Sequence, residues 1–138
     1  MTTRTTGRAL ALLALAALAG CDGPRTTEPP PDPAEPGILT VTLATPAADD
    51  RALVVQISGP EAIGAVTSAG GGYLVHSRTA GTTVRVAVFG PLADGPLLRI
   101  SVPDVRKAAA YSAQVMEVAG ASHALRETLS GYSAVVAR

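Results

Sequence analysis

The chain is poor in the residues that usually crosslink or decorate small protein domains. Its 138 residues include one cysteine, one lysine and four aromatic residues, and they include neither tryptophan nor asparagine. A single cysteine excludes an internal disulfide, and the lack of asparagine excludes N-glycosylation. The folded part must therefore be held by its apolar core, for which about 100 residues are enough.

An excess of charge of either sign is also missing. The formal net charge of the whole chain is zero, and after residue 20 there remain nine Lys or Arg and eleven Asp or Glu residues. Binding to nucleic acid requires a concentrated basic surface, and a polybasic membrane patch requires clustered Lys and Arg. The sequence therefore predicts no nucleic-acid partner and no electrostatic binding to lipid.

The residue patterns of nucleophilic catalysis and of zinc binding are absent. There is no G-x-S-x-G elbow, and the one cysteine and two histidines cannot form a zinc ligand set. His76 is followed by Ser77, but neighbouring residues of a strand point to opposite faces and cannot act as a pair. His123 lies in a polar segment. We therefore predict no catalytic residues, no cofactor and no enzymatic activity.

Aspartates in turns are the remaining candidates for a metal site. Asp49, Asp50, Asp94 and Asp104 lie in predicted turns, and calcium is bound by six or more oxygens. No D-x-D-x-D-G loop is present, and the three glycines at 70–72 lack the pattern of a phosphate-binding loop. The favoured interpretation is that these aspartates are solvated turn residues and that no metal is bound.

The N-terminal segment does carry a strong pattern. A basic region, Met1–Arg8, precedes the apolar run Ala9–Ala19, which consists only of Ala and Leu. This is the layout of a secretory signal peptide. The run is too short for a transmembrane helix, which needs about 20 apolar residues.

Leu18-Ala19-Gly20-Cys21, at the end of that run, resembles the lipobox of bacterial lipoproteins. The resemblance implies that Leu18, Ala19 and Gly20 are read by a signal peptidase and that Cys21 carries the lipid. Two or three acyl chains anchor a protein almost irreversibly. It further implies location in the cell envelope, at the outer membrane or the periplasmic face of the inner membrane. The alternative is cleavage after Ala19, which would release a protein with a free thiol.

The segment Asp22–Pro36 has six prolines among its fifteen residues. Such a segment stays extended and disordered, and polyproline II rises about 3.1 Å per residue. We interpret it as a spacer, with a PxxP ligand as the alternative. The predicted organisation is a signal peptide at 1–20, a lipidated cysteine and linker at 21–36, and a folded domain at 37–138.

Apolar and polar residues alternate in five segments of the folded domain, and period two is typical of half-buried strands. The segments are Leu39–Leu43, Leu53–Ile57, Val84–Val88, Leu98–Val102 and Tyr132–Val136. Weaker strand candidates are Gly64–Thr67, Tyr73–Ser77 and Tyr111–Val118. With Gly- and Pro-rich turns between them, these segments predict an all-β fold, an antiparallel β-sandwich of seven or eight short strands, or a barrel.

Two further features leave alternatives open. Ser122–Leu129 is expected to form a short helix or an irregular loop, and otherwise a strand. Tyr111 and Tyr132 follow turns in a way that loosely resembles the tyrosine corner of immunoglobulin-like sandwiches, although core positions at strand starts are favoured. The domain is also loosely similar to cohesin-type sandwiches.

The favoured function is that of a lipid-anchored envelope protein with a structural role, or with a role in binding a protein or polymer. Arg85 and Arg99 are candidates for a binding surface if their strands pair, and a solvated sheet face is the default. One alternative is a carrier of an apolar ligand inside a barrel, which small inward residues such as Ala113, Ala134 and Ala137 would favour. A small envelope enzyme or inhibitor is the other alternative.

Overall fold

The structure is a computed structural model, and it describes residues 29–70 and 72–138. The chain divides into two units, Met1–Pro31 and Asp32–Arg138. The second unit contains all the secondary structure described below. Leu18, Ala19, Gly20 and Cys21 lie outside the described residues, so the predicted lipidation site stays a prediction.

Eight strands and one short 3₁₀ helix make up the folded unit. In chain order they are β1 (Gly37–Ala44), β2 (Asp50–Ser58), β3 (Val66–Ser68), β4 (Leu74–Ala80), β5 (Thr83–Phe89), β6 (Gly95–Val102), η1 (Val105–Ala110), β7 (Ser112–Gly120) and β8 (Ser133–Ala137).

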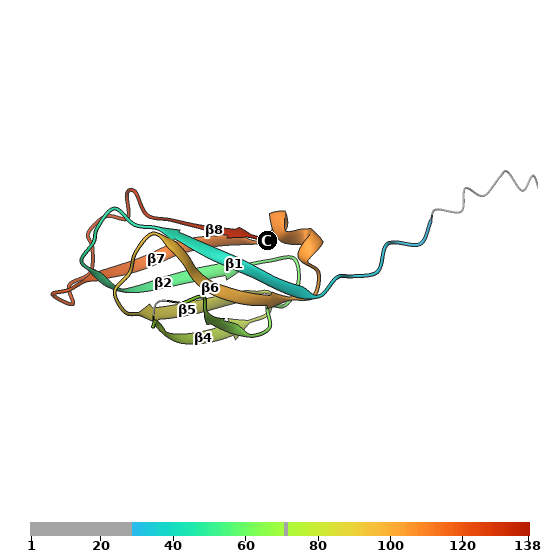
Figure 1. Cartoon of the computed structure of the whole chain (residues 1–138), viewed down its shortest axis with the longest axis horizontal. Helices are drawn as coiled ribbons and strands as arrows, with labels where there is room; N and C mark the ends of the chain where they lie inside the picture. Colours follow the sequence, from blue (N-terminus) through green and yellow to red (C-terminus); the bar gives the residue numbers. More distant parts are fainter. Residues whose placement is uncertain (1–28, 71) are drawn as a thin grey trace, which may run out of the picture. The chain divides into compact units, whose positions relative to one another are not determined.

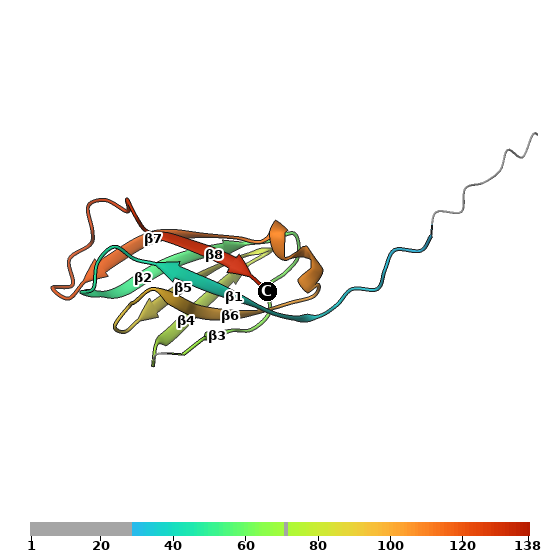
Figure 2. The same ribbon diagram turned by 45° about the horizontal axis from the view of Figure 1, so that its top comes forward.

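The strands form two antiparallel four-stranded sheets that face each other (Figures 1 and 2). The first sheet has the order β3-β6-β1-β8, and the second has the order β4-β5-β2-β7. Every described strand pair is antiparallel. The predicted fold class, an all-β antiparallel sandwich, is therefore confirmed.

The period-two segments form strands because one face of each is apolar. In β1 the side chains of Leu39, Val41 and Leu43 are buried, whereas Thr42 between them is exposed. The other four alternating segments also lie in strands, except that Tyr132 directly precedes β8. The weaker candidates correspond to β3, β4 and β7, with shifted ends.

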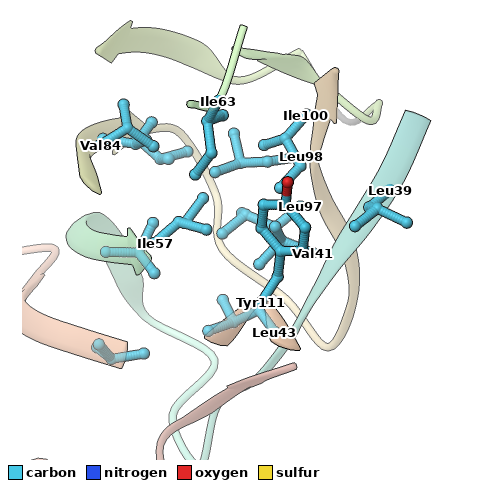
Figure 3. Packing of buried hydrophobic residues seen from close by; sticks show 14 of the residues in the cluster. Leu39, Val41, Leu43, Ile57, Ile63, Val84, Leu97, Leu98, Ile100 and Tyr111 are labelled. Carbon is cyan, nitrogen blue, oxygen red and sulfur yellow. The ribbon is translucent and has the colours of Figure 1, made fainter. Parts of the chain in front are cut away.

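Nineteen buried hydrophobic side chains fill the space between the sheets. Ile57 and Val84 of the second sheet face Leu98 and Ile100 of the first sheet across this core (Figure 3). Burying one such side chain contributes about 1.5–3 kcal/mol to folding. A bulge helps to fill the core: the register between β1 and β6 shifts after Val41, and both Leu97 and Leu98 are buried.

Residues 121–132, between β7 and β8, form an irregular loop with one isolated bridge, Ala119 to Leu125. The loop alternative for Ser122–Leu129 is therefore correct, and the helix alternative is wrong. The helix η1 was not predicted. It begins after Asp104, whose side chain accepts a hydrogen bond from the backbone N–H of Arg106.

The sandwich has two distinct ends. At one end, called the linker end, lie η1, the start of β1 and the C-terminus (Figure 1). The loop of residues 121–132 lies at the opposite end, called the loop end (Figures 1 and 2). Each end carries one buried aspartate, Asp104 at the linker end and Asp50 at the loop end.

Candidate functional site

The last residues of the Pro-rich segment are bonded to the sandwich at the linker end. The backbone N–H of Val105 donates to the carbonyl oxygen of Glu35 at 2.8 Å, and the N–H of Glu35 donates to Asp104 Oδ1 at 3.3 Å. Arg106 binds both oxygens of Asp104, at 2.9 and 3.0 Å, and its Nη2 donates to the carbonyl oxygen of Asp32. The chain therefore enters β1 from a defined position.

Asp104 is the centre of this attachment. Its carboxylate accepts hydrogen bonds from the Arg106 side chain and from the backbone N–H groups of Arg106 and Glu35. These bonds, above all those from the Arg106 side chain, hold the pKa of Asp104 well below its usual range despite burial. Asp104 thus remains ionised and anchors the linker.

Asp50 organises the loop end in a similar way. Arg126 donates to its Oδ1 from Nε at 2.9 Å and from Nη2 at 2.7 Å. The hydroxyls of Thr45 and Tyr132 donate to its Oδ2, at 2.7 and 2.8 Å. Burial raises the pKa of Asp50, but these hydrogen bonds outweigh burial and the net shift is downward.

The turn aspartates that the sequence singled out are engaged in such contacts. Arg126 also binds Asp49, and Asp94 Oδ1 accepts a hydrogen bond from the N–H of Thr45 at 2.6 Å. The described residues contain no group of three or more Asp, Glu, His or Cys arranged to hold a metal ion. The carboxylates therefore serve as hydrogen-bond acceptors that join loops to strands.

The two tyrosines have different roles, and neither matches a tyrosine corner. The Tyr132 hydroxyl bonds to a carboxylate, not to nearby backbone. The Tyr111 hydroxyl is buried and has no hydrogen-bond partner in the described part of the chain. The resemblance to a tyrosine corner is therefore wrong. The favoured interpretation, core residues at strand starts, is correct, because Tyr111 precedes β7 and Tyr132 precedes β8.

Arg85 and Arg99 do not share a surface. Arg85 lies on β5 of the second sheet and Arg99 on β6 of the first, so their strands do not pair. The condition for a shared binding surface is therefore not met, and both arginines are exposed on sheet faces, as the default interpretation expects. Arg85 instead lies directly opposite Arg78 of β4. Arg78 was missed because every residue of β4 except Val75 is exposed, so the strand shows no alternation of burial.

Two adjacent shallow hollows flank this arginine pair. One has a volume of about 390 Å³ and is lined by Gln56, Ala80 and Thr83 together with both arginines. The other, of about 280 Å³, is lined by His76 and Ala87 among others, again with both arginines. His76 and Ser77 occupy successive positions of β4, so the structure gives no support for a catalytic pair.

The interior of the sandwich gives no support for an apolar carrier. The space between the sheets is occupied by core side chains (Figure 3). Of the small residues expected to face inward, Ala113 and Ala134 are partly buried against the core, whereas Ala137 is exposed. The expected inward position of Ala137 is therefore wrong.

Comparison with protein-family models, with curated proteins and with solved structures found no match. Within the described residues, no helix has the length and apolar character needed to cross a bilayer.

Proposed function

We propose that the chain is a lipid-anchored protein of the bacterial cell envelope that displays a β-sandwich for binding. The observation that carries the proposal is the sequence Leu18-Ala19-Gly20-Cys21 at the end of an apolar leader. The thiolate of Cys21 would be the nucleophile that accepts the diacylglyceryl group. Envelope localisation follows from this chemistry.

The attachment of the linker supports a display role. The hydrogen bonds of Asp32 and Glu35 fix the point at which the linker joins the folded unit. About ten linker residues then lie between Cys21 and Asp32. Ten residues in polyproline II conformation span about 30 Å. Such a spacer would hold a domain clear of lipid headgroups while its attachment point on the domain stays fixed.

The role assigned to the domain is binding, not catalysis. The aspartates at both ends of the sandwich are committed to hydrogen bonds that hold loops and linker. Other polar side chains, Arg78 and Arg99 among them, are exposed on strands, where they are available to a partner.

Acylation is tested by expressing the full chain in a bacterium fed an alkyne-tagged fatty acid. We expect labelling, partition into the detergent phase, and an N-terminal peptide that starts at an acylated Cys21. Cys21→Ser should abolish the label. The matched control, Cys21→Ser with Thr26→Cys, keeps one thiol but moves it five residues, and it should remain unlabelled. A peptide that starts at Gly20 with a free thiol would refute the anchor.

A further inference from the structure

Arg78 and Arg85 are directly opposite each other on neighbouring strands, with their side chains on the outer face of the second sheet. Like charges at opposed positions of an antiparallel pair destabilise a sheet. Both side chains are exposed. A local arrangement that opposes folding is expected mainly where function requires it.

No carboxylate in the described residues neutralises this pair. The arginines that hold the fold do have such partners: Arg106 binds Asp104, Arg126 binds Asp50, and Arg138 binds Glu35. Arg85 instead donates from Nε to Gln56 Oε1 at 3.1 Å, which orients its guanidinium over β2.

The same face changes character along the strands. Four residues from Arg78, Leu74 lies opposite Phe89, and these side chains are 58% and 44% exposed. His76 lies between the two pairs, and its ring packs edge-on against that of Phe89, with 6.3 Å between the ring centroids. The face therefore has a cationic end and an apolar end, with an imidazole between them.

The backbone next to this face is also open. β4 is the outermost strand of the second sheet and pairs only with β5 (Figures 1 and 2). Apart from the half-buried Val75, all its residues are exposed. An edge strand presents unpaired N–H and C=O groups to which an extended peptide can add as a further strand.

We propose that β4 and the arginine pair form a docking site for an extended acidic segment of a partner protein. The segment adds antiparallel to β4, and every second side chain then lies on the outer face. A carboxylate meets Arg78 through the fork geometry that guanidinium offers, and Arg85, one strand further in, adds positive charge beside it. An apolar side chain four positions further along meets Leu74 and Phe89.

A polypeptide is favoured over other anions by the combination of these features. Charge alone would suit phosphate or lipid headgroups equally well, but an open strand edge is specific for a peptide backbone. Four residues of β4 separate Arg78 from Leu74, so the ligand residues opposite these two positions are also four apart. The ligand position midway between them lies opposite His76, beside the hollow that His76 and both arginines line, and a second carboxylate there gives the pattern Glu-x-Glu-x-Leu.

The inference rests on the binding role proposed above, but not on the lipid anchor. The test therefore uses the purified full chain in an uncharged detergent, where binding does not depend on Cys21. The probe is the fluorescent peptide Thr-Glu-Thr-Glu-Thr-Leu-Thr. Its control, Thr-Thr-Glu-Glu-Leu-Thr-Thr, has the same composition and charge without the alternation.

The proposal predicts that the first peptide binds more tightly than the control and that added salt weakens its binding. Arg78→Gln with Arg85→Gln should reduce the affinity about tenfold, because the contribution of a single exposed ion pair is small and this variant removes both positive charges of the site. The matched control is Arg99→Gln, which removes an exposed arginine from the other sheet and should leave binding unchanged. Melting curves verify that each variant is folded.

Four results would overturn the proposal. The first is that the alternating peptide does not bind, and the second is that the two peptides bind equally well. The third is that the double arginine variant binds the alternating peptide as tightly as the native chain does. The fourth is that phosphatidylglycerol, added to the micelles at a concentration below that of the peptide, displaces the peptide. The last result would assign the arginines to a lipid headgroup. None of the four would bear on acylation of Cys21, so the two proposals fail separately.

Discussion

Tyr132 donates its hydroxyl hydrogen bond to Asp50 at 2.8 Å, across 82 positions of sequence. Asp50 opens β2 of the second sheet, and Tyr132 immediately precedes β8 of the first. The bond therefore joins the two sheets at the loop end. Because Asp50 is fully buried, each of its hydrogen bonds replaces hydration that the carboxylate loses on folding.

Removing this hydroxyl should destabilise the domain. We expect Tyr132→Phe to lower the free energy of unfolding by about 1.5–3 kcal/mol, the usual contribution of a hydrogen bond to a charged group. Urea denaturation of the full chain measures the change. Tyr111→Phe is the matched control, because its buried hydroxyl has no partner in the described residues, and we expect almost no loss. Equal losses in the two variants would contradict this assignment.

The sandwich should become less stable in acid. The pKa values of Asp50 and Asp104 are both lowered in the folded state, so the unfolded chain binds protons more readily there. Their stabilising contribution is complete above the ordinary aspartate pKa of about 3.9, and it disappears as the pH falls through the lower folded values. Denaturant titrations between about pH 6 and pH 2 should show this decline.

The acid dependence can be assigned to one residue. Asp104→Asn should lower stability at neutral pH and flatten the decline, so that the variant and the native chain converge in acid. Glu127→Gln is a suitable control, because Glu127 is exposed in the loop of residues 121–132. A native chain whose stability stays constant down to pH 2 would show that these carboxylates do not stabilise the fold.

Asp104 should also control the order of the linker at its junction with β1. Because its carboxylate accepts the N–H of Glu35, Asp104→Ala should release that bond and weaken the neighbouring bond from the N–H of Val105 to Glu35. Hydrogen exchange should then become faster at both amides while β2 and β5 keep their protection. Unchanged exchange at Glu35 and Val105 would show that the linker is held by other contacts.

Much of the fold could be predicted because its central strands are amphipathic. β1 and β5 alternate buried and exposed residues, and this pattern is local in the sequence. β4 lacks the pattern, since even Ser77 and Thr79 are exposed, and its limits could not be predicted.

The candidate site was harder to predict, because it depends on pairing between strands. The two-residue turn at Gly81 and Thr82 places Arg78 opposite Arg85 only once both strands are recognised, and no local signal assigns Arg99 to the other sheet. The same limit applies to Arg126, which reaches Asp50 across 76 positions. Only the acylation signal, four adjacent residues ending at Cys21, is fully local, and it could be proposed from sequence alone.

Close packing of Gly59 against Tyr111 provides a test of the core at the linker end. A Cβ added at Gly59 would overlap the ring of Tyr111, a residue that is only 5% exposed. The backbone of Gly59 is not left-handed, so alanine meets no conformational strain there. The cost of Gly59→Ala is therefore steric, and we expect a loss of about 1–3 kcal/mol. If the ring is the cause, the same substitution should cost much less in a Tyr111→Leu background, as a double-mutant cycle would measure. If the substitution costs the same in both backgrounds, the Tyr111 ring is not the cause. The loss would then be assigned to distortion of the hydrogen bond from the Gly59 N–H to the carbonyl oxygen of Thr82.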